Sequence, residues 1–242
     1  MKKINYLLCL FSSILAFSSC TKFDNYKAPE ETLKGQVINK NTGAPLQTEM
    51  GEGGLRIKLM EYSWSDSPTP YYFGGMQEGT FQNTKIFAGE YGITVMGPFV
   101  PLPEETHKVK GVVDLKWEVE PFLDIEWVGE PVINSDKTVT VQAKIKRGTN
   151  NPDYQQRVSD VRFFVVSGAP YVGENNKDER YCVFYGGDEA NSMVGGQVLT
   201  FTTKMPLQSG FTYRLRVGAR IDKDVEGTRR YNYNEMKTIV IP

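Results

Sequence analysis

The sequence is poor in the residues from which reactive centres are built. Its 242 residues contain one histidine, His107, and three cysteines. A single histidine excludes a zinc centre with several His ligands, and a cysteine cluster is excluded because, as argued below, only Cys182 remains as a free thiol. There is also no Gly-X-Ser-X-Gly elbow, no phosphate-binding glycine loop with Lys-Ser or Lys-Thr, and no dinucleotide-binding motif. The 29 acidic residues offer many pairs for glycoside hydrolysis, but we expect most to lie on solvated strand faces. We predict no catalytic residue, no metal site and no cofactor.

An excess of basic charge is also missing. The chain has 28 Lys and Arg against 29 Asp and Glu, a net charge of −1. Removing residues 1–19, which include Lys2, Lys3 and no acid, changes this net charge to −3. Proteins that bind nucleic acids show a clustered basic excess. We therefore expect no nucleic-acid partner.

Long apolar runs are absent except at the start of the chain. Residues 4–17 form a mainly apolar run that follows two lysines and precedes two serines and Cys20. The run is shorter than the about 20 residues that a membrane-spanning helix needs, and the pattern is that of a secretory signal. Because the small residues end on a cysteine, residues 1–19 resemble a lipoprotein signal peptide, and Cys20 is the predicted lipidation site for fatty acids such as palmitate. The alternative is an ordinary signal peptide with a chance cysteine.

Cysteine usage after such cleavage leaves no disulfide. Cys9 leaves with the signal and Cys20 takes the lipid, so Cys182 is the remaining thiol. It lies in an apolar, strand-like run, where a free cysteine is usually a small buried hydrophobe. A nucleophilic role needs a histidine partner, and His107 lies in a loop-like stretch of the other half. Residues 20–31 are polar and predict a lipidated tether.

Strand-like alternation of apolar and polar residues dominates the rest of the chain, and no window shows a useful helical stripe. The clearest strands are 33–37, 55–59, 91–95, 115–119, 139–145, 161–165, 199–201 and 213–221. The fold class is therefore all-β. Two sets of strands meet near Pro121, which predicts two tandem β-sandwiches over residues 32–121 and 122–242.

Each half carries a recognisable motif. The segment Leu33–Leu46, the turn Glu78–Phe81 and the segment Ala88–Tyr91 resemble a transthyretin-like, carboxypeptidase-regulatory-type sandwich, with Phe81 and Tyr91 expected in its core. Leu207, Gly210 and Tyr213, followed by alternating apolar residues, resemble the tyrosine corner of immunoglobulin-like and fibronectin type III domains. In that corner the tyrosine hydroxyl bonds back to the backbone.

A lipoprotein signal followed by these two domains resembles a family of unknown function among the outer-membrane lipoproteins of Bacteroidota polysaccharide-utilisation loci. The segment Asn83–Tyr91 matches the family pattern closely. The resemblance implies a position beside a TonB-dependent transporter and a SusD-like glycan-binding lipoprotein. We expect a lipid anchor in the outer membrane, and we favour exposure at the cell surface over a periplasmic position.

One segment suggests contact with a polysaccharide. Residues 62–73 are punctuated by proline and crowded with aromatic side chains. Sugar rings stack their apolar faces on aromatic rings, and short polar side chains orient their hydroxyl groups. The candidate glycan-binding residues are Trp64, Asp66, Tyr71 and Tyr72. In the alternative, Tyr72 and a neighbour belong to the core and Trp64 packs under the loop. Trp117 and Trp127 are predicted to be core residues.

Two charged groups have competing interpretations. Asp222, Asp224 and Glu226 occupy a predicted hairpin tip, where they either hold calcium or form an acidic turn balanced by neighbouring basic residues. We favour the acidic turn. Arg214, Arg216 and Arg220 share one strand face and either meet an acidic ligand or partner or, as we favour, pair with acids across the sheet.

The sequence thus predicts a non-catalytic outer-membrane lipoprotein that serves as an accessory glycan-binding component of a polysaccharide uptake system. The alternative is a structural subunit that docks on a TonB-dependent transporter complex without touching sugar.

Overall fold

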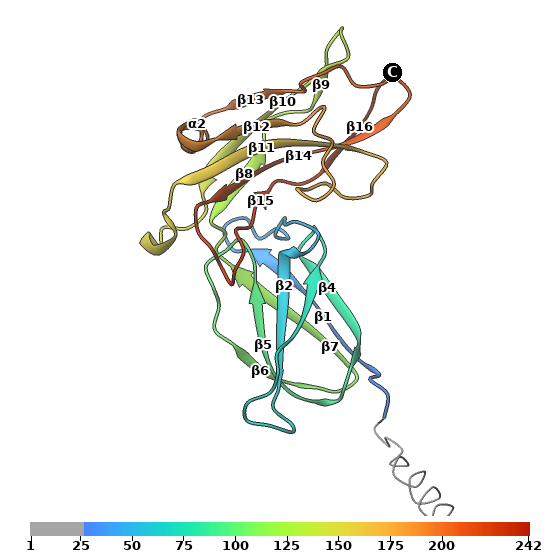
Figure 1. Cartoon of the computed structure of the whole chain (residues 1–242), viewed down its shortest axis with the longest axis vertical. Helices are drawn as coiled ribbons and strands as arrows, with labels where there is room; N and C mark the ends of the chain where they lie inside the picture. Colours follow the sequence, from blue (N-terminus) through green and yellow to red (C-terminus); the bar gives the residue numbers. More distant parts are fainter. Residues whose placement is uncertain (1–26) are drawn as a thin grey trace, which may run out of the picture.

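The computed structural model describes residues 27–242, so the predicted signal peptide and the lipidation site Cys20 lie outside the described residues. Two β-sandwiches are stacked end to end (Figure 1). The predicted all-β fold class, with a transthyretin-like sandwich followed by an immunoglobulin-like one, is confirmed. The predicted limits 32–121 and 122–242 stay predictions. The two main buried cores draw on residues 33–119 and 122–241.

The first sandwich consists of a three-stranded and a four-stranded sheet. In the first sheet the central strand pairs with one neighbour antiparallel and with the other in parallel. The order is β4 (Thr80–Ile86), β1 (Glu31–Asn39) and β7 (Val112–Val119); the opposing sheet has the order β3 (Tyr71–Gly75), β2 (Gly51–Glu61), β5 (Gly89–Met96) and β6 (Glu105–Val109).

The core of this sandwich contains the predicted aromatic residues. Phe81 and Tyr91 are 2% and 5% exposed, and Trp117 is also buried, as predicted. Phe81 packs on Gly35, where an added Cβ would lie 2.6 Å from the phenyl ring and 2.3 Å from the Leu115 carbonyl oxygen. Glycine at position 35 therefore allows β1 to approach both the ring and the neighbouring strand.

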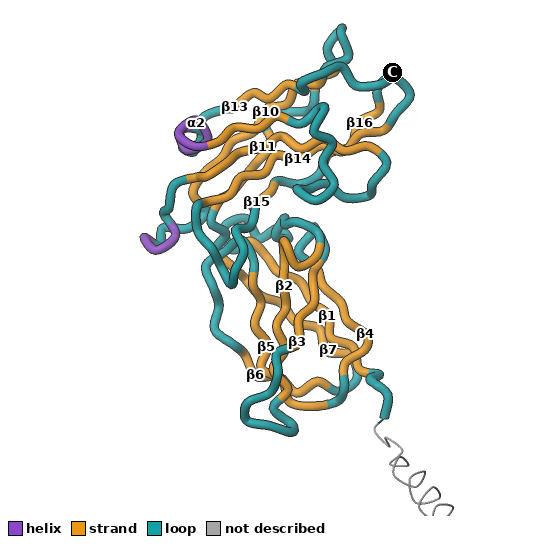
Figure 2. Tube along the Cα trace, viewed as in Figure 1, coloured by secondary structure: helices purple, strands orange, loops and turns teal. Residues whose placement is uncertain are grey.

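The second sandwich is built from the remaining strands (Figure 2). A short 3₁₀ helix, η1 (Pro152–Tyr154), and one helical turn and a half, α2 (Gly187–Ser192), interrupt the strands. One sheet contains β13 (Leu199–Thr202), β10 (Val139–Arg147) and β8 (Leu123–Trp127), with β9 (Val132–Ile133) beside β10; the other contains β12 (Val183–Gly186), β11 (Val158–Ser167), β14 (Thr212–Ile221) and β15 (Asn232–Tyr233), with β16 (Lys237–Val240) also paired to β14.

The tyrosine corner forms as predicted. Tyr213 is buried at the start of β14, and the Gln208 backbone N–H donates to its hydroxyl oxygen over 3.1 Å. Gly210, between them, has a φ of 78°, which only glycine adopts readily. The motif thus ties the chain that enters β14 to the strand itself.

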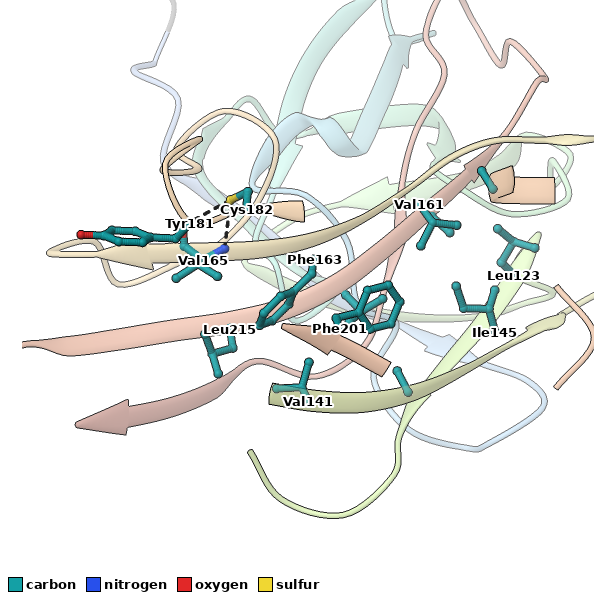
Figure 3. Close-up of a cluster of buried hydrophobic side chains, with 14 of the residues drawn as sticks. Leu123, Val141, Ile145, Val161, Phe163, Val165, Tyr181, Cys182, Phe201 and Leu215 are labelled. Atoms are coloured by element: carbon teal, nitrogen blue, oxygen red, sulfur yellow. Dashed lines mark hydrogen bonds between the residues drawn. The ribbon is translucent and has the colours of Figure 1, made fainter. Parts of the chain in front are cut away.

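Cys182 belongs to the buried core of the second sandwich and lies beside Val165 of β11 (Figure 3). The side chain has no exposed surface, and the Val165 N–H donates to its sulfur over 3.2 Å. Burial raises the pKa of this thiol from 9.0 to about 11. The predicted structural role is confirmed. His107, expected in a loop, lies instead in β6 of the first sandwich, because residues 105–109 pair with β5.

We expect Cys182 to resist a disulfide-exchange reagent at pH 8 and to react at once in urea, because the thiolate is the nucleophile. In a chain that starts at Thr21 it is the only thiol. Because folding raises its pKa, its contribution to stability is constant below about pH 9 and is lost as pH rises toward 11. Fast labelling of the native protein at pH 8 would contradict this burial.

Candidate functional site

A cluster of buried polar side chains joins the two sandwiches. At its centre, Arg216 of β14 is 0% exposed. Its Nη1 donates to the Thr48 carbonyl of the first sandwich (2.8 Å) and to the Val172 carbonyl of the second (3.1 Å). Its Nε donates to the Asn234 carbonyl (2.9 Å). Burial lowers the pKa of Arg216 to about 10, so the guanidinium stays charged at neutral pH.

A second buried contact crosses the same junction. The hydroxyl of Tyr233 donates to Oε2 of Glu49 over 2.5 Å, and the Glu174 backbone N–H donates to the same oxygen over 2.6 Å. Burial, followed by the Glu49 carboxylate, raises the pKa of Tyr233 well above its ordinary value. The Arg216 guanidinium lies 4.3 Å from the centroid of the Tyr233 ring. We call Glu49, Arg216, Tyr233 and Asn234 the junction cluster.

A groove of about 880 Å³ opens beside the junction cluster. Most of its walls come from three segments that are distant in sequence: the turn after β1, strand β8, and the segment from β15 to β16. The lining residues are Asn39, Asn41, Thr42, Ala44–Gln47, Glu78, Leu123–Trp127, Lys146 and Asn232–Lys237. We call this cavity the junction groove. Ligand sites occur preferentially at such boundaries between domains.

Strand β8 presents an open sheet edge to the groove. Within residues 27–242 it pairs only with β10. The Val128 N–H donates to the Gln142 carbonyl, and Trp127 is paired with Ala143. Because hydrogen-bonded and non-bonded positions alternate in an antiparallel pair, the backbone groups of Ile125 and Trp127 point away from β10. These N–H and C=O groups are available to a ligand with hydroxyl groups.

Amide and carboxylate side chains form a connected polar wall. Asn39 Nδ2 donates to one oxygen of Asp124 (2.6 Å), and Asn41 Nδ2 donates to the other (2.7 Å). Asn41 Nδ2 also donates to the Gly148 carbonyl (2.6 Å). Each carboxylate oxygen can accept more than one hydrogen bond. The wall therefore holds fixed acceptors for hydroxyl groups.

Trp127 supplies the aromatic surface of the groove. The prediction that it is a core residue is wrong in part, because it packs against the core but stays half-buried in the groove wall. Its indole N–H donates to the Glu235 carbonyl over 2.7 Å, and the Lys237 ammonium lies 5.6 Å from the ring centroid. These contacts fix the indole ring relative to the groove wall that contains Glu235 and Lys237.

The aromatic segment that the sequence singled out lies elsewhere. Trp64 and Tyr71 are 71% and 51% exposed, Asp66 is exposed, and Tyr72 is half-buried under the guanidinium of Arg56. Trp64 does not pack under the loop, whereas Phe73 does contact the core. None of the four candidates lines the junction groove. Their role in binding stays a prediction.

The position of this segment also separates it from the groove. It connects β2 to β3 at the end of the first sandwich farthest from the second, where the described chain begins (Figure 1). Strand pairing supports this position. Glu61 at the end of β2 pairs with Tyr91 near the start of β5, and Gly89 at the start of β5 pairs with Val109 at the end of β6.

Several charged groups of β14 and the nearby hairpin have structural partners. Asp222 pairs with Arg229 over 2.6 Å, and the described residues contain no group of three or more His, Cys, Asp or Glu placed to hold a metal. Arg220 pairs with Asp160 over 2.8 Å, as favoured from the sequence. Arg216 instead donates its hydrogen bonds to carbonyl and side-chain amide oxygens at the junction. No helix formed by residues 27–242 has the length and apolarity that a membrane crossing requires.

Sequence reasoning missed the main groove residues, Asn39, Asn41, Asp124 and Trp127. Asn39 and Asn41 flank a turn, where asparagine is common for local reasons. Asp124 and Trp127 lie on a short strand whose open edge depends on the three-dimensional pairing. No local signal distinguished these residues from ordinary turn and strand positions.

Comparisons with known proteins identify relatives over nearly the whole chain. The family described as "Protein of unknown function (DUF3823) N-terminal domain" matches residues 31–120. The chain is similar to the solved structure of a DUF3823 family protein from Bacteroides uniformis ATCC 8492. The identity is 32% and the TM-score 0.79, over 88% of this chain and 100% of the other. None of the curated proteins matches the chain.

Two more distant structures share the fold. One, from Bacteroides uniformis ATCC 8492, is described as a candidate carbohydrate-binding protein, with 20% identity and a TM-score of 0.69. The other is a DUF3823 family protein from Parabacteroides merdae ATCC 43184, with 19% identity and a TM-score of 0.67. In both cases 88% of this chain and 100% of the other are covered.

Proposed function

Since this chain belongs to the DUF3823 family, we propose that it is a non-catalytic outer-membrane lipoprotein that binds a glycan in the junction groove. It works as an accessory component of a polysaccharide uptake system, beside a TonB-dependent transporter and a SusD-like lipoprotein. The candidate carbohydrate-binding protein with the same fold is consistent with this role.

The observation that carries the proposal is the composition of the junction groove. It combines an anchored aromatic ring, Trp127, with amide and carboxylate groups held by Asn39, Asn41 and Asp124, and with the open backbone edge of β8. Glycan binding needs this mixture, because a sugar presents apolar C–H faces and many hydroxyl groups. The volume of about 880 Å³ is ample for a few sugar rings.

The junction cluster favours a preformed site. Gln47, Tyr233 and Asn234 line the groove, and each also makes a hydrogen bond or ring contact with the buried Arg216 or Glu49. Fixed walls reduce the entropy that a site loses on binding. We therefore expect the walls to move little when a ligand binds.

The test is retention of the protein in native gels that contain single polysaccharides, together with a hydrolysis assay on the same panel. We expect slowed migration with at least one polysaccharide and no release of reducing sugar. Unchanged migration across the panel, with capture of a transporter from solubilised membranes, would favour the scaffold interpretation. Hydrolysis of any oligosaccharide by the pure protein would overturn the non-catalytic assignment.

The lipid anchor is tested separately. In cells fed labelled palmitate, we expect the full chain to incorporate label and the Cys20→Ala variant to incorporate none, because Cys20 would carry the acyl chains. The Cys182→Ala variant is the matched control, since that thiol is buried. Equal labelling of the Cys20→Ala variant and the unchanged chain would show that the signal is not of the lipoprotein kind.

A further inference from the structure

The charged side chains of the junction groove are unevenly divided between the two signs. Four carboxylates line it, from Glu78, Asp124, Glu126 and Glu235, against the two ammonium groups of Lys146 and Lys237. No arginine is among the lining residues. A fully ionised lining therefore carries a net charge of −2, the difference between two positive and four negative groups.

Both lysines of the groove are already paired. Lys146 Nζ lies 3.0 Å from Oε1 of Glu126. Lys237 Nζ lies 2.8 Å from a carboxylate oxygen of Glu130, donates to the Gly129 carbonyl over 2.7 Å and lies above the Trp127 ring. An acidic sugar that met one of these lysines would have to share its positive charge with a glutamate.

The carboxylates of the groove keep capacity for hydroxyl donors. Asp124 accepts from the Asn39 and Asn41 amides, and Glu78 accepts from Gln77 Nε2 over 2.6 Å. None of these three contacts involves a cation, so the negative charge of Asp124 and Glu78 is not cancelled by them. A carboxylate accepts hydrogen bonds from sugar hydroxyls and repels a uronate or a sulfate.

The buried charges behind the wall do not reverse this balance. Arg216 is positive, but it interacts electrostatically with two carboxylates, Glu49 and the groove residue Glu78, and Tyr233 contacts both Arg216 and Glu49. The groove therefore faces a ligand with acceptors and unshared negative charge, and its cations are occupied.

We propose that the junction groove selects uncharged glycans and discriminates against acidic ones such as uronate-containing or sulfated polysaccharides. The inference rests on the proposed function and adds the chemical class of the ligand. Its basis is the acidic lining of a groove in which each lysine is held by a glutamate.

The experiment compares matched pairs of polysaccharides in native affinity gels with the full chain. Dextran, xylan, mannan and galactan are each used unmodified, hydroxyethylated and carboxymethylated, so that bulk and charge change separately. For any polymer that retards the protein, we expect the hydroxyethylated form to bind similarly. The carboxymethylated form should bind about tenfold more weakly at low salt, with the difference shrinking at about 1 M salt, where charges are screened.

A charge variant tests whether the discrimination arises in the groove. Glu126→Gln removes one lining carboxylate and frees Lys146, so we expect carboxymethylated polymer to regain several-fold in affinity. Asp114→Asn is the control, because it removes an exposed carboxylate and frees Lys34 on the first sandwich. Equal binding of neutral and carboxymethylated forms would overturn the inference and leave the proposed function intact. Retention by none of the polymers would contradict the proposed function, and the inference with it.

Discussion

The Arg216→Met variant is expected to lose about 3 to 5 kcal/mol of unfolding free energy, the largest effect of any substitution considered. Methionine keeps an unbranched, flexible side chain, but it ends about where the guanidinium begins and donates no hydrogen bond. The carbonyl groups of Thr48, Val172 and Asn234 would stay buried without the guanidinium that now donates to them. Each buried acceptor left without a donor costs about 1 to 3 kcal/mol.

A buried charge also opposes folding, and this cost must be compared with the loss of hydrogen bonds. Burial lowers the pKa of Arg216, which shows that the charged form is penalised at this site. Replacing every member of a buried ionic cluster by apolar groups is often neutral. In Arg216→Met only one member of the junction cluster changes, and the three carbonyl acceptors stay buried. The cost of the lost hydrogen bonds therefore exceeds the gain from removing a buried charge.

Urea denaturation followed by fluorescence measures this prediction. Arg214→Met is the matched control, because Arg214 is half-buried on the same strand face two residues earlier; we expect it to cost less than about 1 kcal/mol. Arg216→Lys keeps the charge but has fewer hydrogen-bond donors, so its loss of unfolding free energy should be intermediate. This variant still tests the prediction if Arg216→Met does not fold. An Arg216→Met midpoint equal to that of the unchanged chain would show that the junction cluster does not hold the sandwiches together.

Trp127→Ala is expected to weaken retention by the best-bound polysaccharide about tenfold or more, because a central aromatic anchor usually contributes most of the energy of a binding site. The indole lines the groove and is held by the Glu235 carbonyl. Trp127→Phe keeps an aromatic surface and should restore part of the retention. Native affinity gels measure both variants, and thermal melts establish that the fold survives.

Trp64→Ala is the matched control for this result. Trp64 is 71% exposed on the loop between β2 and β3, outside the groove. We expect it to leave retention within about twofold of the unchanged chain, as for surface substitutions away from a site. If Trp64→Ala abolished retention and Trp127→Ala did not, the segment containing Trp64, Asp66, Tyr71 and Tyr72 would be the site.

The strands that alternate strictly were predictable from sequence. Residues 139–145 and 213–221 lie in β10 and β14, because one face of each strand is buried in a single core. The short strands β3, β6 and β12 were predicted less well: β6 was expected in a loop, β3 only in the alternative that placed Tyr72 in the core, and β12 only as part of the strand-like run around Cys182. Their burial patterns mix exposed and half-buried residues, so the pairing partner rather than the local pattern makes them strands.

The environment of Arg216 could not be predicted from the alternation of apolar and polar residues in its strand. The alternation of β14 correctly places Arg214, Arg216 and Arg220 on the face opposite to the main core, which contains Leu215 and Val217. Part of that face is covered within the second sandwich itself, where Phe164, Val172 and Tyr233 belong to a further buried cluster and Arg216 lies over the Tyr233 ring. The first sandwich also covers this face at Arg216, and no periodicity within one strand encodes contact with another domain.

The junction groove could not be predicted for a related reason. Most of its walls come from residues 39–47, 123–127 and 232–237, which only the folded chain brings together. The tyrosine corner and the buried Phe81 could be predicted, because each depends on a motif contained in a few consecutive residues. Local motifs thus specified the two sandwiches, and the stacking of the sandwiches created the site.

Amide hydrogen exchange, measured with and without the polysaccharide that retards the protein most, tests most directly whether the groove is the binding site. Segments 39–47, 123–127 and 232–237 should exchange more slowly in the complex, with the open edge of β8 at Ile125 and Trp127 most affected. Segment 62–73 should be unchanged. Protection confined to segment 62–73, with the three groove segments unaffected, would contradict the account.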